Sequence, residues 1–160
     1  EERFVLSEAF VSLPVGFVAL CDYSGPEVSD YEDLAGLRVG VLDGDNLESE
    51  LSGRGIPYVK TPYMESAAKL IDYHRIDGVF GYRSVLLALI GQRSGLQPFK
   101  YHHVLDHPLY LGISRSYPDA QVLIDRFNKG MQKLRASGRH QIIVDENLPF
   151  RTYEECIPSK

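Results

Sequence analysis

The sequence of 160 residues has no tryptophan and only two cysteines, Cys21 and Cys156. No apolar run approaches the roughly 20 residues that a membrane-spanning helix needs, and no CxxC pair suggests a redox or zinc motif. The 17 basic residues are scattered along a chain with 22 acidic ones and a net charge of −5, which argues against nucleic-acid binding. The two cysteines could pair in an oxidising compartment or both be free, and their spacing does not decide between these states.

What the sequence does contain is typical of a folded globular protein. Hydrophobic residues make up 44% and charged residues 24% of the chain, which is an ordinary balance for a soluble domain with a core. The sequence begins at Glu1 without methionine and shows no signal peptide, so we interpret it as a mature or trimmed fragment.

Strands and helices are expected to alternate through the middle of the chain. The expected strands cover residues 15–21, 37–42, 57–60 and 76–82, and the expected helices cover residues 46–52, the segment after a Thr61 cap, and 84–95. Two more strands are expected at 103–105 and 108–114, followed by a long helix that Ser116 and Asp119 cap and a last helix at 139–147. This alternation predicts an α/β domain with a mostly parallel sheet.

The stretch Asp43-Gly44-Asp45 follows the expected strand 37–42. Asp45 suits the N-cap of the next helix, with Glu48 completing a capping box. An Asp-x-Asp after a strand also resembles the start of haloacid-dehalogenase phosphatases, in which Asp43 would be the nucleophile and Asp45 the acid beside magnesium. Leu47 departs from that family's pattern, about 40 residues precede the motif, and no acidic pair follows at a later strand end. We therefore expect no enzyme, no metal and no cofactor.

A cluster of imidazoles and a carboxylate, "HHVLDH" at residues 102–107, invites a metal hypothesis. His102 and His103 are adjacent, however, and neighbouring side chains on a strand point to opposite faces of the sheet. We therefore expect surface histidines near a strand end.

Four segments in order resemble type II periplasmic solute-binding proteins, the polar-amino-acid-binding family of ABC importers. They are "FVLSEAFVSLPVGFVAL" (4–20), "YEDLAGLRVGVLDGDNLESEL" (31–51), "TPYMESAAKLIDYHRIDGVFGYRSVLLALI" (61–90) and "YLGISRSYPDAQVLIDRFNKGMQKLRASGRHQIIV" (110–144). The resemblance covers about residues 4–146 and rests on the order and spacing of the motifs together.

The resemblance implies a fold of two α/β lobes joined by two hinge strands. It assigns residues 15–21 and 109–115 to the hinge strands, residues 22–108 to a complete second lobe, and residues 1–14 and 116–160 to a remnant of the first lobe. The family has a further N-terminal part of the first lobe that this sequence lacks. The long helix would then expose its core stripe, which consists of Leu123, Phe127, Met131 and Leu134.

The resemblance also implies a ligand site. Asp43, Gly44, Asp45 and Asn46 match the loop that contacts the ligand's carboxylate in the family. Here the loop is acidic. Asp45, as a helix cap, would use donors that an anion needs and would repel a carboxylate.

Two neighbouring positions extend this expected site. Tyr82 stands where the family has the aspartate that binds the ligand's α-ammonium group, and Asp77 matches a structural aspartate instead. Tyr82 could stack on a ring or a sugar. Arg83 could bind an anion or be a solvated residue of the first helical turn.

The function implied is that of a solute-binding component of an ABC importer, in the periplasm or anchored by lipid outside the cell. It would bind a small polar molecule, an amino acid or a related compound, and would work as a monomer with transporter membrane subunits. Two alternatives with the same fold are the sensor domain of a membrane receptor, of histidine kinase or cyclase type, and a degenerate relative that binds nothing.

Overall fold

The computed structural model describes residues 3–91, 99–148 and 156, and these form two compact units. The larger unit takes in residues 14–91, 99–106 and 156, and the smaller unit takes in residues 3–13 and 107–148. The chain passes between them inside strand β2 (Val11–Leu20) and again inside strand β6 (Phe99–Leu109). Among the described residues, no helix combines the length and the apolar character that a membrane span requires.

The larger unit is built on a five-stranded sheet with the order β4-β3-β5-β2-β6. The remaining strands are β3 (Val39–Leu42), β4 (Tyr58–Thr61) and β5 (Gly78–Tyr82). Strand β3 is parallel to both β4 and β5, whereas β2 is antiparallel to β5, with Val15 opposite Tyr82. The sheet is therefore mixed, because β2 enters it from the smaller unit and not through a helical crossover of its own.

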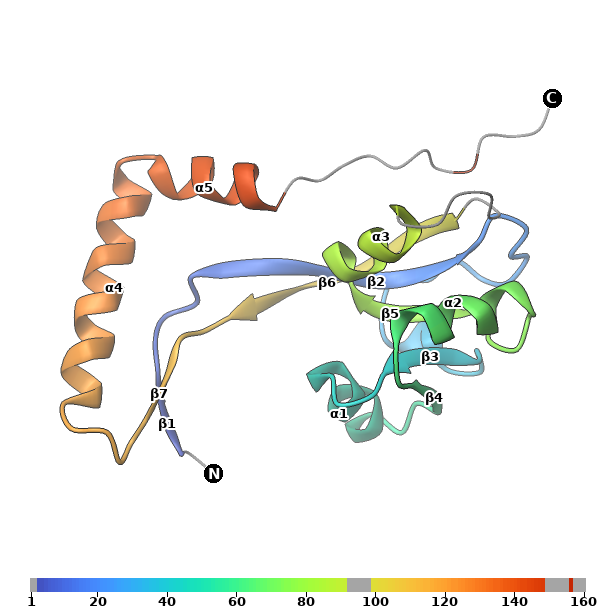
Figure 1. The fold of residues 1–160 in the computed structure, drawn as a ribbon, viewed down its shortest axis with the longest axis horizontal. Helices are drawn as coiled ribbons and strands as arrows, with labels where there is room; N and C mark the ends of the chain where they lie inside the picture. The colour runs from blue at the N-terminus through green and yellow to red at the C-terminus, as the bar shows by residue number, and fades with distance from the viewer. Residues whose placement is uncertain (1–2, 92–98, 149–155, 157–160) are drawn as a thin grey trace. The chain divides into compact units, whose positions relative to one another are not determined.

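Helices cover both faces of this sheet (Figure 1). Along β2, Phe17 belongs to one core cluster and Val18 to the other, as expected for alternating side chains of a buried strand. The first face carries η1 (Glu32–Leu34) and α1 (Asn46–Gly53), and the second carries α2 (Met64–Asp72) and α3 (Arg83–Gly91). The sequence placed the start of α3 at residue 84, and the end that it predicted at Gly95 lies outside the described residues.

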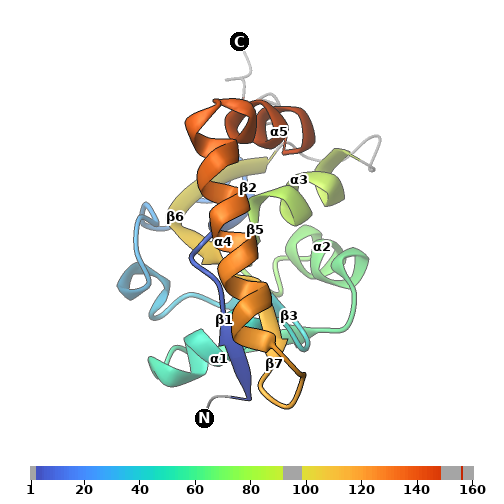
Figure 2. The same ribbon diagram turned by 90° about the vertical axis from the view of Figure 1, so that its left-hand side faces the viewer.

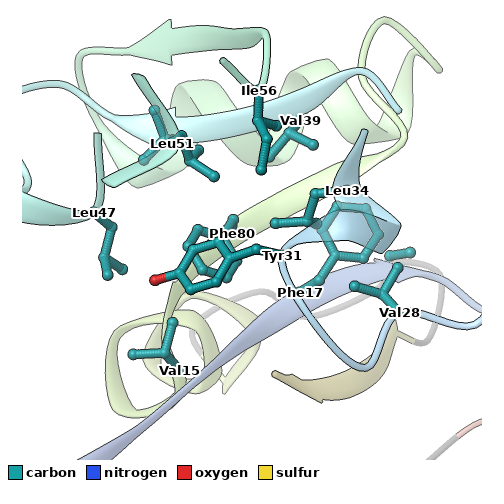
Figure 3. Packing of buried hydrophobic residues seen from close by; sticks show 12 residues of the cluster. Val15, Phe17, Val28, Tyr31, Leu34, Val39, Leu47, Leu51, Ile56 and Phe80 are labelled. Carbon is teal, nitrogen blue, oxygen red and sulfur yellow. The ribbon is translucent and has the colours of Figure 1, made fainter. Parts of the chain in front are cut away.

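Aromatic and aliphatic side chains fill the first face (Figure 3). The rings of Tyr31 and Phe80 meet edge to face at 5.5 Å between centroids, and Leu34, Leu47 and Leu51 are fully buried around them. Burial of a side chain of this size contributes about 1.5–3 kcal/mol, so this cluster fixes α1 and η1 on the sheet.

Strands β2 and β6 lie side by side at Gly16. A Cβ atom at Gly16 would come within 2.2 Å of the backbone oxygen of His102. On the smaller unit's side, the amide of Phe10 donates to the carbonyl of Leu109 over 3.0 Å. The two segments in which the chain changes units are therefore neighbours on both sides of the change, and a glycine permits the closest approach.

The histidine segment of β6 differs from the sequence-based expectation at His102. Its side chain is only 5% exposed, and its Nδ1 accepts a 3.4 Å hydrogen bond from the amide of Val28. Burial and the charge of Lys100 lower the pKa of His102. The alternation is confirmed, since His103 is exposed, but the prediction of surface histidines is wrong for His102 because β6 begins four residues earlier than expected. In the described ranges no group of three or more His, Cys, Asp or Glu side chains could hold a metal ion.

The smaller unit is a two-stranded antiparallel sheet with two helices (Figure 2). Strand β1 (Phe4–Leu6) pairs with β7 (Gly112–Ser114), α4 (Ala120–Ala136) packs against both strands, and α5 (Arg139–Asn147) follows. The expected strand 108–114 is divided because Ser7 Oγ accepts the bond of the Leu111 amide, which interrupts the ladder between β6 and β7.

Helix α4 exposes much of its apolar stripe, as expected. Its buried residues are Ala120 and Ile124, whereas the stripe side chains are only partly covered, namely Leu123, Phe127, Met131 and Leu134. The other face of the small sheet is also open: Phe4 and Leu6 are 52% and 58% exposed, in a pocket of about 360 Å³ that Arg3 and Arg115 complete.

Two predicted helix caps are wrong. The N-cap of α2 is Tyr63, and the hydroxyl of Thr61 is buried and donates to the carbonyl of Val41 instead. The N-cap of α4 is Asp119, but its side chain makes no capping bond, and Ser116 hydrogen-bonds with Ser114. In both cases the neighbouring strand provides a partner that the sequence pattern does not reveal.

The cysteines are paired. A disulfide joins Cys21, next to the end of β2, with Cys156, which follows α5 in the sequence. It closes a loop with a sequence separation of 135 residues and places Cys156 with the larger unit.

Replacing Gly16 with alanine should destabilise the protein by roughly 2–3 kcal/mol, because the new methyl group would overlap the carbonyl of His102. Gly53→Ala is the matched control: it adds a methyl group within α1 where nothing lies within 4 Å, and it should stabilise by up to about 1 kcal/mol. Urea unfolding of both variants measures the difference, and equal stabilities would contradict the close approach of β2 and β6.

Replacing both cysteines with serine should lower the free energy of unfolding by about 2–5 kcal/mol, because the unfolded chain loses a long covalent loop. Dithiothreitol should lower the unfolding midpoint of the wild type towards that of the double variant. It should leave the variant itself unchanged, and a midpoint that is insensitive to reduction in both proteins would refute the stabilising role of the bridge.

Candidate functional site

The candidate site starts at the carboxyl end of β3, in the turn Asp43-Gly44-Asp45-Asn46. Gly44 has φ +81°, a conformation that favours glycine. Asp45 is the N-cap of α1, and its Oδ1 accepts from the amide of Leu47 over 3.0 Å. The capping role predicted for Asp45 is therefore confirmed.

Glu48 caps the same turn one residue earlier than a standard capping box. Its Oε2 accepts from the amide of Gly44 over 3.1 Å, whereas the amide of Asp45 donates to the carbonyl of Leu42. Two side-chain carboxylates of this chain therefore occupy amides at the start of α1, where the helix dipole favours negative charge.

Strand β4 adds two polar groups that the sequence analysis missed. Lys60 Nζ lies 2.5 Å from Glu48 Oε1 and 3.4 Å from Asp43, and the hydroxyl of Tyr58 donates to Glu48 over 3.2 Å. The parallel register opposes Val41 to Lys60, which brings the ammonium group to the turn. Alternation within 57–60, which puts Tyr58 and Lys60 on one face, is the signal that could have indicated them.

Hydrogen bonding in this cluster shifts the protonation equilibria in a consistent direction. The bond from Lys60, followed by the bond from the Gly44 amide, lowers the pKa of Glu48. The same contact with Glu48 raises the pKa of Lys60. Both groups therefore remain charged over a wider pH range than they would alone.

Tyr82, at the carboxyl end of β5, joins the turn through a hydrogen bond. Its hydroxyl donates to Asn46 Oδ1 over 3.1 Å. Burial, opposed by the bond to Asn46 and helped by the charges of Asp45 and Glu50, raises the pKa of Tyr82. The side chain is thus a neutral phenol beside an acidic turn.

Arg83 points elsewhere. Its guanidinium carbon lies 5.2 Å from the ring centroid of Tyr101 on β6, and Tyr101 packs against the core on the second face of the sheet, whereas Tyr82 packs against the first. Burial raises the pKa of Tyr101 to about 12, although the charge of Arg83 opposes this. The structure thus groups Asp43 to Asn46 with Tyr82 and places Arg83 on the other face.

A second polar group on α1 was also missed. The hydroxyl of Tyr31 donates to the carboxylate of Glu50, and the guanidinium of Arg54 lies 4.1 Å above the Tyr31 ring. Burial and the bond to Glu50 raise the pKa of Tyr31. These contacts orient α1 on the sheet.

Asp77 has the structural role that the resemblance implied. Its Oδ2 accepts from the amide of Arg38 over 2.7 Å, and its Oδ1 lies 2.5 Å from the guanidinium of Arg38. The guanidinium also donates to the carbonyl of His74. This bond set joins the start of β5 to the start of β3, at the end of the sheet opposite the turn.

Replacing Lys60 with methionine should raise the pKa of Glu48 towards the ordinary value of about 4.3, because the largest cause of its lowered pKa is removed. Stability from Glu48 is present above about pH 4.3 and is lost as the pH falls through its lower folded-state pKa, so the variant should lose less stability in acid. Carboxyl titration by NMR measures the pKa. Lys69→Met on α2 is the control that should leave it unchanged, and an unaltered pKa in the Lys60 variant would contradict the contact.

Neither protein-family models nor curated proteins match this sequence. Solved structures do match. The GluR0 ligand-binding core from Nostoc punctiforme in complex with L-glutamate is 17% identical over 90% of this chain and 65% of its own, with a TM-score of 0.63. AbpA from Streptococcus pneumoniae, an amino acid ABC transporter substrate-binding protein bound to L-arginine, is 15% identical over 90% and 60%, with a TM-score of 0.65.

A histidine kinase sensor domain with similarity to periplasmic binding proteins is 19% identical over 91% of this chain and 63% of its own, with a TM-score of 0.68. The chain thus spans about 60–65% of the length of the structures it matches. The α/β fold predicted from the sequence is confirmed, and these neighbours are binding proteins. The chain has the fold of the type II periplasmic amino-acid-binding proteins.

Proposed function

We propose that this chain is the larger part of a solute-binding protein that closes around a small polar molecule and serves an ABC importer. The observation that carries the proposal is the fold, in which the chain passes between two units inside two adjacent strands, β2 and β6. A double connection of this kind allows hinge motion while keeping both units in one polypeptide. Closure of a hinge around a solute is a signal that a membrane partner can read.

The proposed lobes follow the sequence-based division. Residues 22–108 form the second lobe, residues 15–21 and 109–115 the hinge strands, and residues 1–14 and 116–160 the remnant of the first lobe. The unit boundaries after Leu13 and after Asp106 support this division to within a few residues. The half-covered stripe of α4 supports a first lobe with further parts.

The proposed ligand contacts are Asp43, Gly44, Asp45, Asn46, Tyr82 and Arg83. Support for the first five comes from their position at the carboxyl ends of β3 and β5, the edge of a parallel sheet at which ligands usually bind. Arg83 is the weakest member, because its guanidinium lies against Tyr101. Hydrogen bonds in a site that closure dries would give selectivity.

The proposed location is the periplasm or the outer cell surface, and the proposed partners are transporter membrane subunits. The disulfide supports this location, because disulfides persist in oxidising compartments. The similarity to a histidine kinase sensor domain favours one second candidate, a receptor sensor that uses the same closure. Identification of the membrane domain that is encoded with, or co-purifies with, the protein would distinguish the two.

The test is a thermal-shift screen of the complete protein against amino acids, amines, organic acids and sugars, followed by calorimetry on each hit. A ligand should raise the melting temperature and reduce the radius of gyration in solution scattering. Tyr82→Ala should weaken binding by about tenfold or more, a loss of roughly 1.4 kcal/mol. Tyr73→Ala is the matched control, since Tyr73 is 74% exposed at the end of α2.

Failure of every compound in the screen would refute solute binding. Binding that Tyr82→Ala leaves intact would refute the proposed site and retain the function. Binding without a change in the radius of gyration would refute closure.

A further inference from the structure

We propose that Asp45 and Glu48 determine specificity by closing the start of α1 to carboxylates, so that the ligand group meeting this turn is neutral or cationic. The inference rests on the proposed function and names the ligand class of the same site. It follows from the hydrogen bonds that the turn already makes, together with its charge.

Four of the five amides from Gly44 to Glu48 donate to acceptors within the chain. Gly44 donates to the Glu48 carboxylate, and Leu47 donates to the Asp45 carboxylate. The amides of Asp45 and Glu48 donate to the carbonyls of Leu42 and Asp45. An incoming carboxylate normally binds at such a helix start through free amides, and here it would have to displace two carboxylates that are covalently part of the turn.

The charges at the turn act in the same direction. Asp43, Asp45 and Glu48 lie within six residues, and the Asp43 side chain is 56% exposed. The neighbouring cation, Lys60, is in contact with Glu48 at 2.5 Å and with Asp43 at 3.4 Å. A ligand carboxylate would therefore meet negative charge whose nearest cationic partner is already engaged.

Tyr82 supports a neutral environment at the adjoining strand end. Its phenol, with a raised pKa, donates to Asn46 Oδ1 and introduces no positive charge. The group it could offer to a ligand is the lone pair of a hydroxyl oxygen, which suits an N–H or O–H donor better than an anion.

The test separates occupied donors from charge by using two substitutions of one residue. Asp45→Asn removes the charge and keeps a side-chain oxygen at a good N-cap, whereas Asp45→Gly removes both charge and acceptor with little further cost to the helix. The probe is sodium acetate, added against sodium chloride at a constant total of roughly 0.1 M salt to hold screening constant. The readout is the NMR shift of the Gly44 and Leu47 amides in the complete protein.

The wild type should show no saturable shift of either amide with acetate. Asp45→Gly should bind acetate at Leu47 about fivefold more tightly than Asp45→Asn, the effect of one freed hydrogen bond. Saturable binding of acetate by the wild type would overturn the inference. Equal affinities of the two variants would also overturn it, because charge alone would then account for the selectivity.

A matched ligand pair provides the second arm. Arginine and agmatine differ only by the carboxylate, and calorimetry on the complete protein should show agmatine binding more tightly by about fivefold or more, on the same reasoning. Tighter binding of arginine overturns the inference and leaves solute binding intact. Failure of every compound in the wider screen removes the proposed function, and the inference about its ligand fails with it.

Discussion

The contact on which the structure depends is the approach of β2 to β6 at Gly16. A hydrogen atom in place of a side chain lets the carbonyl of His102 lie where a Cβ would stand. Those two strands are also the places where the chain changes units. The sheet of the larger unit and the double connection to the smaller one are therefore consequences of the same pairing, since neither strand could shift along the other without moving the core side chains that alternate on β2.

The turn at the end of β3 shows how a common scaffold acquires its own chemistry. The backbone is that of a strand leading into a capped helix, a geometry suited to anions. Asp45 and Glu48 fill it from within, and Lys60 neutralises part of the added charge. The sheet provides the position and the side chains decide what can bind there, so the likeness to glutamate- and arginine-bound structures is a statement about fold, while the ligand has to be inferred from these residues.

Much of this architecture could be predicted from the sequence, because hydrophobic periodicity and helix caps are local. The alternation gave β3, α1, β5 and α5 nearly to the residue, and the spacing Asp45-x-x-Glu48 indicated the cap. What failed depended on partners distant in sequence. Thr61 bonds a carbonyl on β3, Ser7 interrupts β7, and Val28 holds a buried His102. Lys60 reached the turn through strand register, which the order of residues does not encode directly.

The pairing of Val15 with Tyr82 has a mechanical consequence. Tyr82 touches the turn through Asn46, and the residue opposite it in the ladder lies two positions beyond the last residue of the smaller unit, Leu13. Any displacement of the phenol by an occupant is therefore passed through a single backbone rung to the strand that leads out of the larger unit. Recognition and movement would share one pair of residues, with no relay of side chains needed between them.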